Sequence, residues 1–401
     1  MKSTFFRFCL LMCVPLFGVA CSGSEKLQGN EFLIEGNISG VEDGVVITLS
    51  RMDGNVGTRI ASDTVRDGRF MFKEEALSNP EQIMMIPRGD GFPSMYLNIW
   101  VAPGAKVKIK GKGKLFPAWE VNSYVPYQKE ENIYAKKSRE IISEISRISV
   151  ESSILQTKTR EASSDDEALK YRKAVDSLEA IRTSLMTKIY IADIEIMEKT
   201  HISPIWLDKM KGVTMSLKFS EIDNEYDDEL RKKAEVLYGK MTEEDKTTPA
   251  GYEITANLFP PPVVRVGDDM PDAVFFDTNG NTKHLSDYSG KYLLLDFWSI
   301  GCGPCIMAFP EMKEVAELYS ENLTIVSISL DTDNSWKEAL GKHDMPWVNI
   351  RDPKAIGGLA ANYGVIGIPY YVIISPAGKV IDKWGGFGNG FIKKKVSENV
   401  K

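Results

Sequence analysis

The feature that most constrains the fold is a cysteine pair placed between a buried strand and a helix. Residues 292–298, YLLLDFW, form an apolar run of strand length, and Cys302 and Cys305 follow shortly after it as C-G-P-C. Strand-like and helix-like segments alternate over residues 263–401. This alternation predicts an α/β layered domain in which the cysteine pair opens a helix.

A cysteine at the beginning of a helix is suited to disulfide exchange. The free N–H groups and the positive end of the helix dipole stabilise a thiolate, which is the attacking species. We expect Cys302 to be exposed and to attack a substrate disulfide. Cys305, one turn later, is expected to be buried and to resolve the mixed disulfide. Gly303 keeps the approach to the sulfur open, and Pro304 fits the first turn of a helix.

Several motifs in order resemble those of the TlpA/ResA-type thiol–disulfide oxidoreductases of the thioredoxin superfamily. CGPC is identical to the thioredoxin active-site sequence, LLLDFW precedes it, and Pro310 stands where the family's active-site helix has its kinking proline. Residues 363–380, YGVIGIPYYVIISPAGKV, are similar to the segment around the family's cis-proline. The resemblance covers residues 263–401 and implies a thioredoxin fold and thiol–disulfide oxidoreductase activity. We expect no cofactor beyond the dithiol.

The resemblance implies roles for further residues around the pair. Asp296 interrupts the buried strand where the family has the acid that takes the proton from the resolving cysteine; the alternative is a structural carboxylate. The Ile368–Pro369 bond is expected to be cis and to face the cysteines, and the backbone beside it to pair with an extended substrate. Isoleucine there, with Gly-Pro between the cysteines, is the combination of reducing thioredoxins. Trp298 and Ile368 are expected to contact substrate, whereas Gly301 replaces the family's usual tryptophan.

The N-terminal sequence predicts export and lipid attachment. Basic residues precede an apolar run over residues 8–20, which has the length of a signal-peptide core and is short for a membrane span. Small residues then lead to Cys21, and this arrangement resembles a bacterial lipoprotein signal, with Gly18 where leucine is usual. The resemblance implies removal of residues 1–20, lipid on Cys21 and a tether over residues 21–29. The alternative is an ordinary signal peptide that leaves Cys21 free.

Between the tether and the α/β domain, the sequence predicts two more parts of a multidomain chain. Residues 30–120 alternate apolar and polar residues between Asp-Gly and Pro-Gly turns, which predicts an antiparallel β-sandwich-like domain. Within it, SDTVRDGRFMF resembles a β-rich domain of unknown function that precedes thioredoxin-like domains in lipoproteins of Bacteroides-like bacteria. Residues 121–240 predict a helical segment, either a packed spacer or a partner-binding arm. Residues 241–262 are expected to be a linker.

Composition and spacing argue against other classes of function. The formal net charge is −7, whereas nucleic-acid binding usually needs a basic surface. The 3 histidines are scattered and one C-x-x-C supplies only two ligands, so no metal site is predicted. Once the signal is removed, the chain has a single close cysteine pair besides Cys21. That count indicates redox chemistry rather than a structural disulfide framework.

We therefore expect a lipid-anchored enzyme of the cell envelope that faces the periplasm and reduces disulfides in exported proteins. Reductants of this family commonly receive electrons from a membrane thiol-transfer protein, which is the expected donor. Ser22 after Cys21 favours the outer membrane. Two alternatives remain open. One is a peroxiredoxin-like thiol peroxidase, whose P-x-x-x-T/S-x-x-C pattern would require proline at Leu295. The other is a surface-binding lipoprotein regulated by its redox domain.

Overall fold

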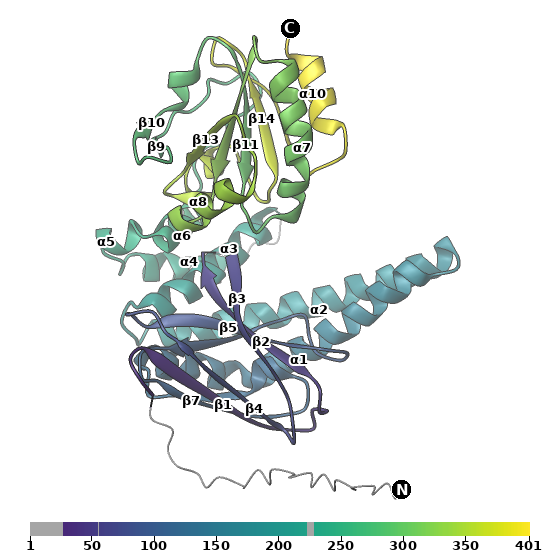
Figure 1. The fold of residues 1–401 in the computed structure, drawn as a ribbon, viewed down its shortest axis with the longest axis vertical. Helices are drawn as coiled ribbons and strands as arrows, with labels where there is room; N and C mark the ends of the chain where they lie inside the picture. The colour runs from purple at the N-terminus through teal and green to yellow at the C-terminus, as the bar shows by residue number, and fades with distance from the viewer. Residues whose placement is uncertain (1–26, 55, 223–227) are drawn as a thin grey trace, which may run out of the picture.

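The computed structural model describes residues 27–54, 56–222 and 228–401, which form a multidomain chain (Figure 1). A β-sandwich comes first, a group of helices follows it, and an α/β domain closes the chain. The predicted signal peptide and Cys21 lie outside the described residues. Within the described ranges, every helix is too short or too polar to cross a membrane.

Two four-stranded sheets form the N-terminal sandwich, with the strand orders β4–β1–β7–β8 and β3–β2–β5–β6. The strands are β1 (Glu31–Ser39), β2 (Val46–Asp53), β3 (Val56–Thr64), β4 (Arg69–Glu75), β5 (Glu81–Arg88), β6 (Leu97–Val101), β7 (Lys106–Lys112) and β8 (Glu120–Asn122). Alternate residues of both sheets face one shared apolar core. The predicted antiparallel sandwich is confirmed, with one parallel pair, β1 and β7, that the turn spacing did not indicate.

Among the described residues, six helices follow the sandwich, after the short 3₁₀ turn η1 (Phe116–Ala118). They are α1 (Pro126–Glu161), α2 (Asp165–Met197), α3 (Pro204–Ile222), α4 (Asp228–Tyr238), α5 (Glu243–Lys246) and α6 (Pro249–Leu258). The helices α1 and α2 form a long hairpin whose far end extends beyond the sandwich (Figure 1). Ser164 caps α2 by accepting a hydrogen bond from the Glu167 N–H.

The predicted linker over 241–262 is largely helical, and this part of the prediction is wrong. Its threonines and acidic residues act as helix caps: Thr242 and Thr248 accept hydrogen bonds from the backbone at the beginnings of α5 and α6. Ile254 and Leu258 are buried in the core shared with α3 and α4. Polar composition alone therefore could not distinguish two capped helices that pack on the helical core from a flexible linker. The prolines after α6 lie outside regular structure, as do the short stretches before α5 and between α5 and α6.

The α/β domain has a seven-stranded sheet in the order β10–β9–β13–β12–β11–β14–β15. Its strands are β9 (Phe275–Phe276), β10 (Thr282–Lys283), β11 (Tyr292–Trp298), β12 (Leu323–Ser329), β13 (Val348–Arg351), β14 (Tyr370–Ile374) and β15 (Val380–Gly385). Its helices are α7 (Gly303–Leu318), α8 (Asp333–Lys342), α9 (Leu359–Asn362) and α10 (Phe391–Asn399), with 3₁₀ turns η2 (Leu285–Tyr288) and η3 (Ala355–Gly357). The strands β11, β12 and β13 run parallel, whereas β14 and β15 are antiparallel, and this arrangement is a thioredoxin fold.

Alternation along β11 sends its side chains into two separate cores. Leu293, Leu295 and Phe297 pack on the side of α9. Leu294 and Trp298 pack on the opposite side, with residues of α7, α8 and α10. Because side chains alternate with a period of two, Asp296 lies on the same face of the strand as this second pair. The acid therefore faces the layer that contains α7, the helix of the cysteine pair.

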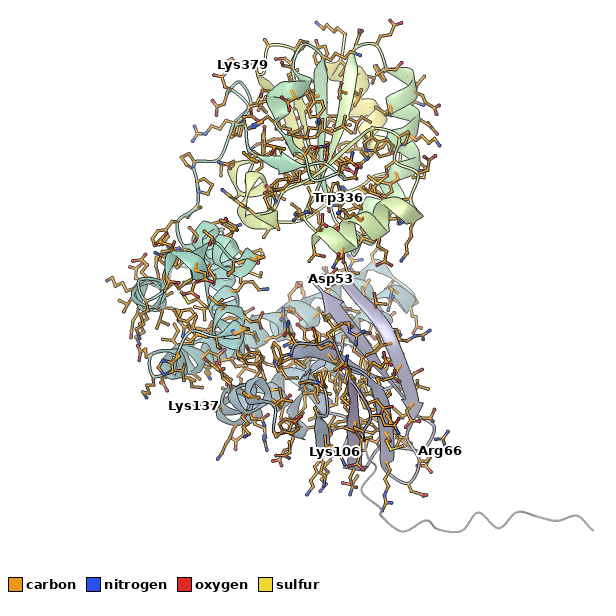
Figure 2. The ribbon with its side chains drawn as sticks, turned by 60° about the vertical axis from the view of Figure 1, so that its left-hand side comes forward. Asp53, Arg66, Lys106, Lys137, Trp336 and Lys379 are labelled. Atoms are coloured by element: carbon orange, nitrogen blue, oxygen red, sulfur yellow. A yellow bond between two sulfur atoms is a disulfide. The ribbon has the colours of Figure 1, made fainter. Side chains whose placement is uncertain are left out.

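The carboxyl ends of β11 and β12 lie at one edge of the sheet, and the N-terminal sandwich docks at this edge. Asp53, at the tip of the β2–β3 hairpin, accepts hydrogen bonds from the hydroxyls of Thr332 (2.6 Å) and Ser335 (2.7 Å) at the beginning of α8. Figure 2 shows Asp53 next to the helix that carries Trp336. The loop of the cysteine pair follows β11 at the same edge, so the edge that carries the pair is turned toward the sandwich.

Candidate active site

The cysteine pair begins α7 and forms a disulfide. The Cys302–Cys305 S–S distance is 2.02 Å. Cys302 is the N-cap of the helix and is half-buried, and its sulfur accepts a hydrogen bond from the Cys305 N–H (3.2 Å). Cys305 is only 1 % exposed. Gly303 and Pro304 between them are exposed, so one sulfur is open to a partner and the other is covered.

Asp296 is a buried carboxyl with one hydrogen-bond donor among the described side chains. It is 1 % exposed, and the hydroxyl of Ser327, its register partner on β12, donates to it at 2.7 Å. The Trp347 indole N–H donates in turn to that hydroxyl at 2.8 Å. Burial raises the pKa of Asp296 to about 7, against the lowering effect of the Ser327 hydrogen bond. This acid can therefore change its protonation near neutral pH.

The Ile368–Pro369 peptide bond is cis, as the resemblance implies. Pro369 is buried, and its carbonyl accepts a hydrogen bond from the Gly386 N–H at 2.8 Å. Ile368 is partly exposed and packs against the same apolar cluster as Cys302. Its backbone N–H and C=O make no hydrogen bond with any residue in the described ranges. These two groups are therefore free to pair with an extended segment of another chain.

Comparisons with known proteins agree with this geometry. The Redoxin family matches residues 265–389. The thiol-disulfide oxidoreductase ResA of Bacillus thuringiensis subsp. konkukian is 32 % identical over 128 residues, 31 % of this chain and 71 % of that protein. This chain belongs to the ResA family of thiol-disulfide oxidoreductases. The ResA protein of Geobacillus thermodenitrificans is 31 % identical over 135 residues, 32 % of this chain and 75 % of that protein.

A solved structure is also similar to part of this oxidoreductase. The thioredoxin domain of a thiol-disulfide oxidoreductase from Bacteroides vulgatus shares 26 % identity, with a TM-score of 0.32. The match covers 34 % of this chain and 99 % of that domain. The two ResA proteins match about a third of the oxidoreductase, so the sandwich and the helices are interpreted from their own residues.

Trp298, which is expected to contact substrate, is buried in the core of the α/β domain. The side chain is 0 % exposed. Its ring packs edge-on against Phe309 of α7, with 5.2 Å between ring centroids. Trp298 therefore packs beneath the active-site helix of the oxidoreductase, in the cluster against which Cys302 also packs. Of the residues expected to contact substrate, Ile368 alone has exposed surface.

The sequence reasoning missed Asp331, which holds the loop before the first cysteine. Its carboxylate accepts hydrogen bonds from the Ser299 hydroxyl (2.6 Å) and from the Ile300 N–H (2.9 Å). The Cys302 N–H in turn donates to the Ser299 carbonyl at 3.0 Å. Asp331 is the second residue after the buried strand β12. Because β11 and β12 are parallel neighbours, their carboxyl ends lie at the same edge of the sheet. A polar residue just after β12 could therefore have been predicted to lie near the loop that follows β11.

Three further expectations about the site concern Gly301, metal binding and Cys21. Gly301 is exposed beside Cys302 and supplies no aromatic surface. Within the described ranges, His, Cys, Asp and Glu side chains nowhere gather in threes in a way that could hold a metal ion. The predicted lipid attachment at Cys21 lies outside the described residues. The Cys302–Cys305 pair is therefore the redox group around which a function can be proposed.

Proposed function

We propose that this oxidoreductase reduces disulfides in exported proteins, with Cys302 as the nucleophile and Cys305 as the resolving cysteine. The observation that carries the proposal is the unequal exposure of a bonded pair at a helix start. A partner disulfide can reach the Cys302 sulfur, which is half-buried, whereas the Cys305 sulfur is covered. The helix N-terminus favours the thiolate form of the attacking cysteine.

The exchange proceeds in two steps that conserve electrons. In the reduced enzyme, the Cys302 thiolate attacks one sulfur of the substrate disulfide, forms a mixed disulfide and releases the other substrate sulfur as a thiolate. The Cys305 thiol then loses its proton and attacks the Cys302 sulfur. The second substrate thiolate leaves, and the Cys302–Cys305 disulfide forms. Two electrons pass from the enzyme to the substrate, so a thiol donor must reduce the enzyme again.

Asp296 is proposed as the acceptor of the Cys305 proton. The acid lies on the face of β11 that is covered by α7, and Cys305 belongs to the core on that face. Its pKa of about 7, raised by burial, allows it to hold a proton at neutral pH and to release it again. Ser327 fixes the carboxyl orientation through its hydrogen bond.

The cis-proline segment is proposed to hold the substrate backbone. The free N–H and C=O of Ile368 can form two hydrogen bonds with an extended substrate strand. The Pro369 carbonyl already accepts the Gly386 N–H, whereas the Ile368 groups are unbonded within the described structure. Exposed Met307, in the second turn of α7, and exposed Ile366 lie close in sequence to the two halves of the site. These apolar side chains would add contact with a partly unfolded substrate.

The cellular setting is proposed from the N-terminal sequence and the resemblance. Cys21 would carry the lipid that anchors the enzyme to a membrane of the cell envelope, with the α/β domain facing the periplasm. The outer membrane is favoured by Ser22. The electron donor would be a membrane thiol-transfer protein, since a periplasmic reductant has no direct access to cytoplasmic electrons.

Trapping the mixed disulfide tests the proposal. Reduced Cys305→Ser protein, mixed with insulin as a disulfide-bearing probe, should accumulate a covalent adduct that dithiothreitol releases. Cys302→Ser is the matched control and should form no adduct. Adduct formation through Cys305 in the Cys302→Ser protein, or hydrogen peroxide consumption far faster than insulin reduction, would contradict the proposal. The second outcome would support the peroxidase alternative.

A further inference from the structure

A cavity lies between the β-sandwich and the helices α1, α2 and α3, and the cysteine pair does not line it. Its volume is about 410 Å³, which suits a small organic molecule. Most of the wall is apolar. Met95 and Trp119 come from the sandwich side, Ile142 from α1, and Met186 and Ile189 from α2. The cavity is therefore built by two parts of the chain whose role the redox chemistry does not explain.

Charged side chains gather at one part of this cavity, and one of them is unpaired. Lys209 of α3 donates to the Glu131 carboxylate at 2.7 Å, and its ammonium lies 5.4 Å from the centroid of the Tyr134 ring. Asp193 of α2 lines the same cavity and is 5 % exposed. It makes no hydrogen bond and no ion pair with any residue that the structure describes. Lys209, the cation that acts on Asp193 among the described residues, thus already forms an ion pair with another carboxylate and attracts Asp193 only at longer range.

A second buried polar group in the cavity also lacks a partner. Ser138 of α1 is 2 % exposed, and its hydroxyl has no hydrogen-bond partner in the described structure. Buried polar groups are almost always hydrogen-bonded, and an unpaired buried carboxylate costs several kcal/mol. The Tyr134 hydroxyl, which lines the same cavity, also has no partner in the described structure. Three such groups in one cavity indicate that a bound molecule completes them. The ionised Asp193 can only accept hydrogen bonds and the two hydroxyls can also accept them, so a molecule with several donors satisfies all three.

We propose that this cavity binds a small amphipathic amine. Its protonated amino group pairs with Asp193, Ser138 offers a further hydrogen-bond acceptor, and its apolar part packs against Trp119 and the aliphatic wall. A carboxylate ligand would meet the charges of Asp193 and Glu131. A neutral alcohol would leave the Asp193 carboxylate without a counter-charge. This site is separate from disulfide exchange and does not depend on it.

Calorimetric titration of the lipid-free protein tests the proposal. This protein lacks residues 1–20 and carries the substitution Cys21→Ser. The probes are n-hexylamine, sodium hexanoate and n-hexanol, which share the same apolar chain and differ in the head group. Hexylamine should bind with one site per chain and at least about tenfold more tightly than either other probe. Absence of saturable hexylamine binding, or equal binding of hexanol, would overturn the proposal, since an apolar cavity alone explains the latter.

A matched pair of variants assigns the binding to the cavity. Asp193→Asn should weaken hexylamine binding about tenfold or more, because it removes the counter-charge. Asp176→Asn, an exposed carboxylate on the same helix, should bind hexylamine as the unmodified chain does. Equal affinity of the Asp193→Asn and Asp176→Asn proteins would overturn the proposal.

The pH dependence of the unmodified chain provides a test without any variant. Burial raises the pKa of Asp193 to about 7, the attraction of Lys209 opposes this, and the charges of Glu131 and Asp208 add to it. Hexylamine stays protonated near neutral pH, so its binding should tighten about tenfold from about pH 6 to about pH 8 as Asp193 ionises. Constant affinity over this range would contradict the proposal. The titratable groups that face Asp193 are Tyr190 on α2, Glu131 and Tyr134 on α1, and Asp208 and Lys209 on α3.

Discussion

Replacing Asp296 by asparagine should change how the stability of the α/β domain depends on pH. In the folded chain, burial raises the pKa of this carboxyl from 3.8 to about 7. The folded state therefore binds the proton more tightly than the unfolded state does. The stabilisation from the protonated acid is complete below about pH 4 and is lost as the pH rises toward about 7. Asparagine keeps the shape of the side chain and cannot ionise.

The magnitude follows from the two pKa values. Each pKa unit corresponds to about 1.4 kcal/mol, so the ionised acid destabilises the folded state by about 4 kcal/mol above both values. Between about pH 5 and about pH 8, the unmodified protein loses about 2.5 kcal/mol of its free energy of unfolding through ionisation of Asp296. The Asp296→Asn protein should therefore gain about 2.5 kcal/mol relative to the unmodified protein over this interval. Ser327 can still form a hydrogen bond with the asparagine amide, so the two proteins differ mainly in whether residue 296 can ionise.

Hydrogen exchange of the β11 and β12 amides measures this difference in the oxidised protein. Because each variant is compared with the unmodified protein at the same pH, the intrinsic exchange rates cancel. Glu321→Gln, an exposed carboxyl just before β12, is the control and should show no pH-dependent difference. If the Asp296→Asn difference is the same at both pH values, the acid is not protonated in the folded state and the reasoning is refuted.

Three further predictions concern the neighbours of this acid, the domain contact and the anchor. Ser327→Ala removes the donor that lowers the pKa of Asp296, so the midpoint of the pH-dependent stability loss should move upward; an unchanged midpoint would show that the hydrogen bond does not act on the carboxylate. Asp53→Ala removes two hydrogen bonds to α8, about 2–3 kcal/mol together, and should enlarge the molecule in small-angle X-ray scattering. Asp67→Asn, in the exposed turn between β3 and β4, is its control, and equal scattering of the two proteins would contradict this docking role. Cys21→Ser should abolish incorporation of labelled fatty acid and release the protein from membranes, and continued labelling would place the lipid elsewhere.

The sequence predicts the thioredoxin fold well because its central strands are long, continuous apolar runs. The structure places β11 at 292–298, the bounds expected from its apolar run, and β12 at 323–329. Buried parallel strands need apolar residues on both faces. The change from an apolar run to polar residues therefore marks where each strand begins and ends. The cysteine pair and the cis-proline segment are similarly local, since each is encoded within a few consecutive residues.

Features that depend on contacts between distant segments could not be predicted in this way. Asp331 approaches Ser299 only because two parallel strands end at the same edge of the sheet. Asp53 meets α8 across 279 positions of sequence, and no local pattern encodes that contact. The helices within 241–262 were missed because threonine and acidic residues serve both loops and helix caps. The buried position of Trp298, by contrast, follows from the alternation of side chains along β11, and the sequence pattern could have predicted it.

The reduction potential of the Cys302–Cys305 pair tests the central claim most directly. The lipid-free protein is equilibrated with glutathione or dithiothreitol buffers, and the fraction of disulfide is measured after acid quenching and thiol alkylation. The proposed reductant should have a potential near that of thioredoxin, about −270 mV. A potential near about −120 mV, the value of a strong oxidant, would contradict the claim and assign the enzyme to disulfide formation instead.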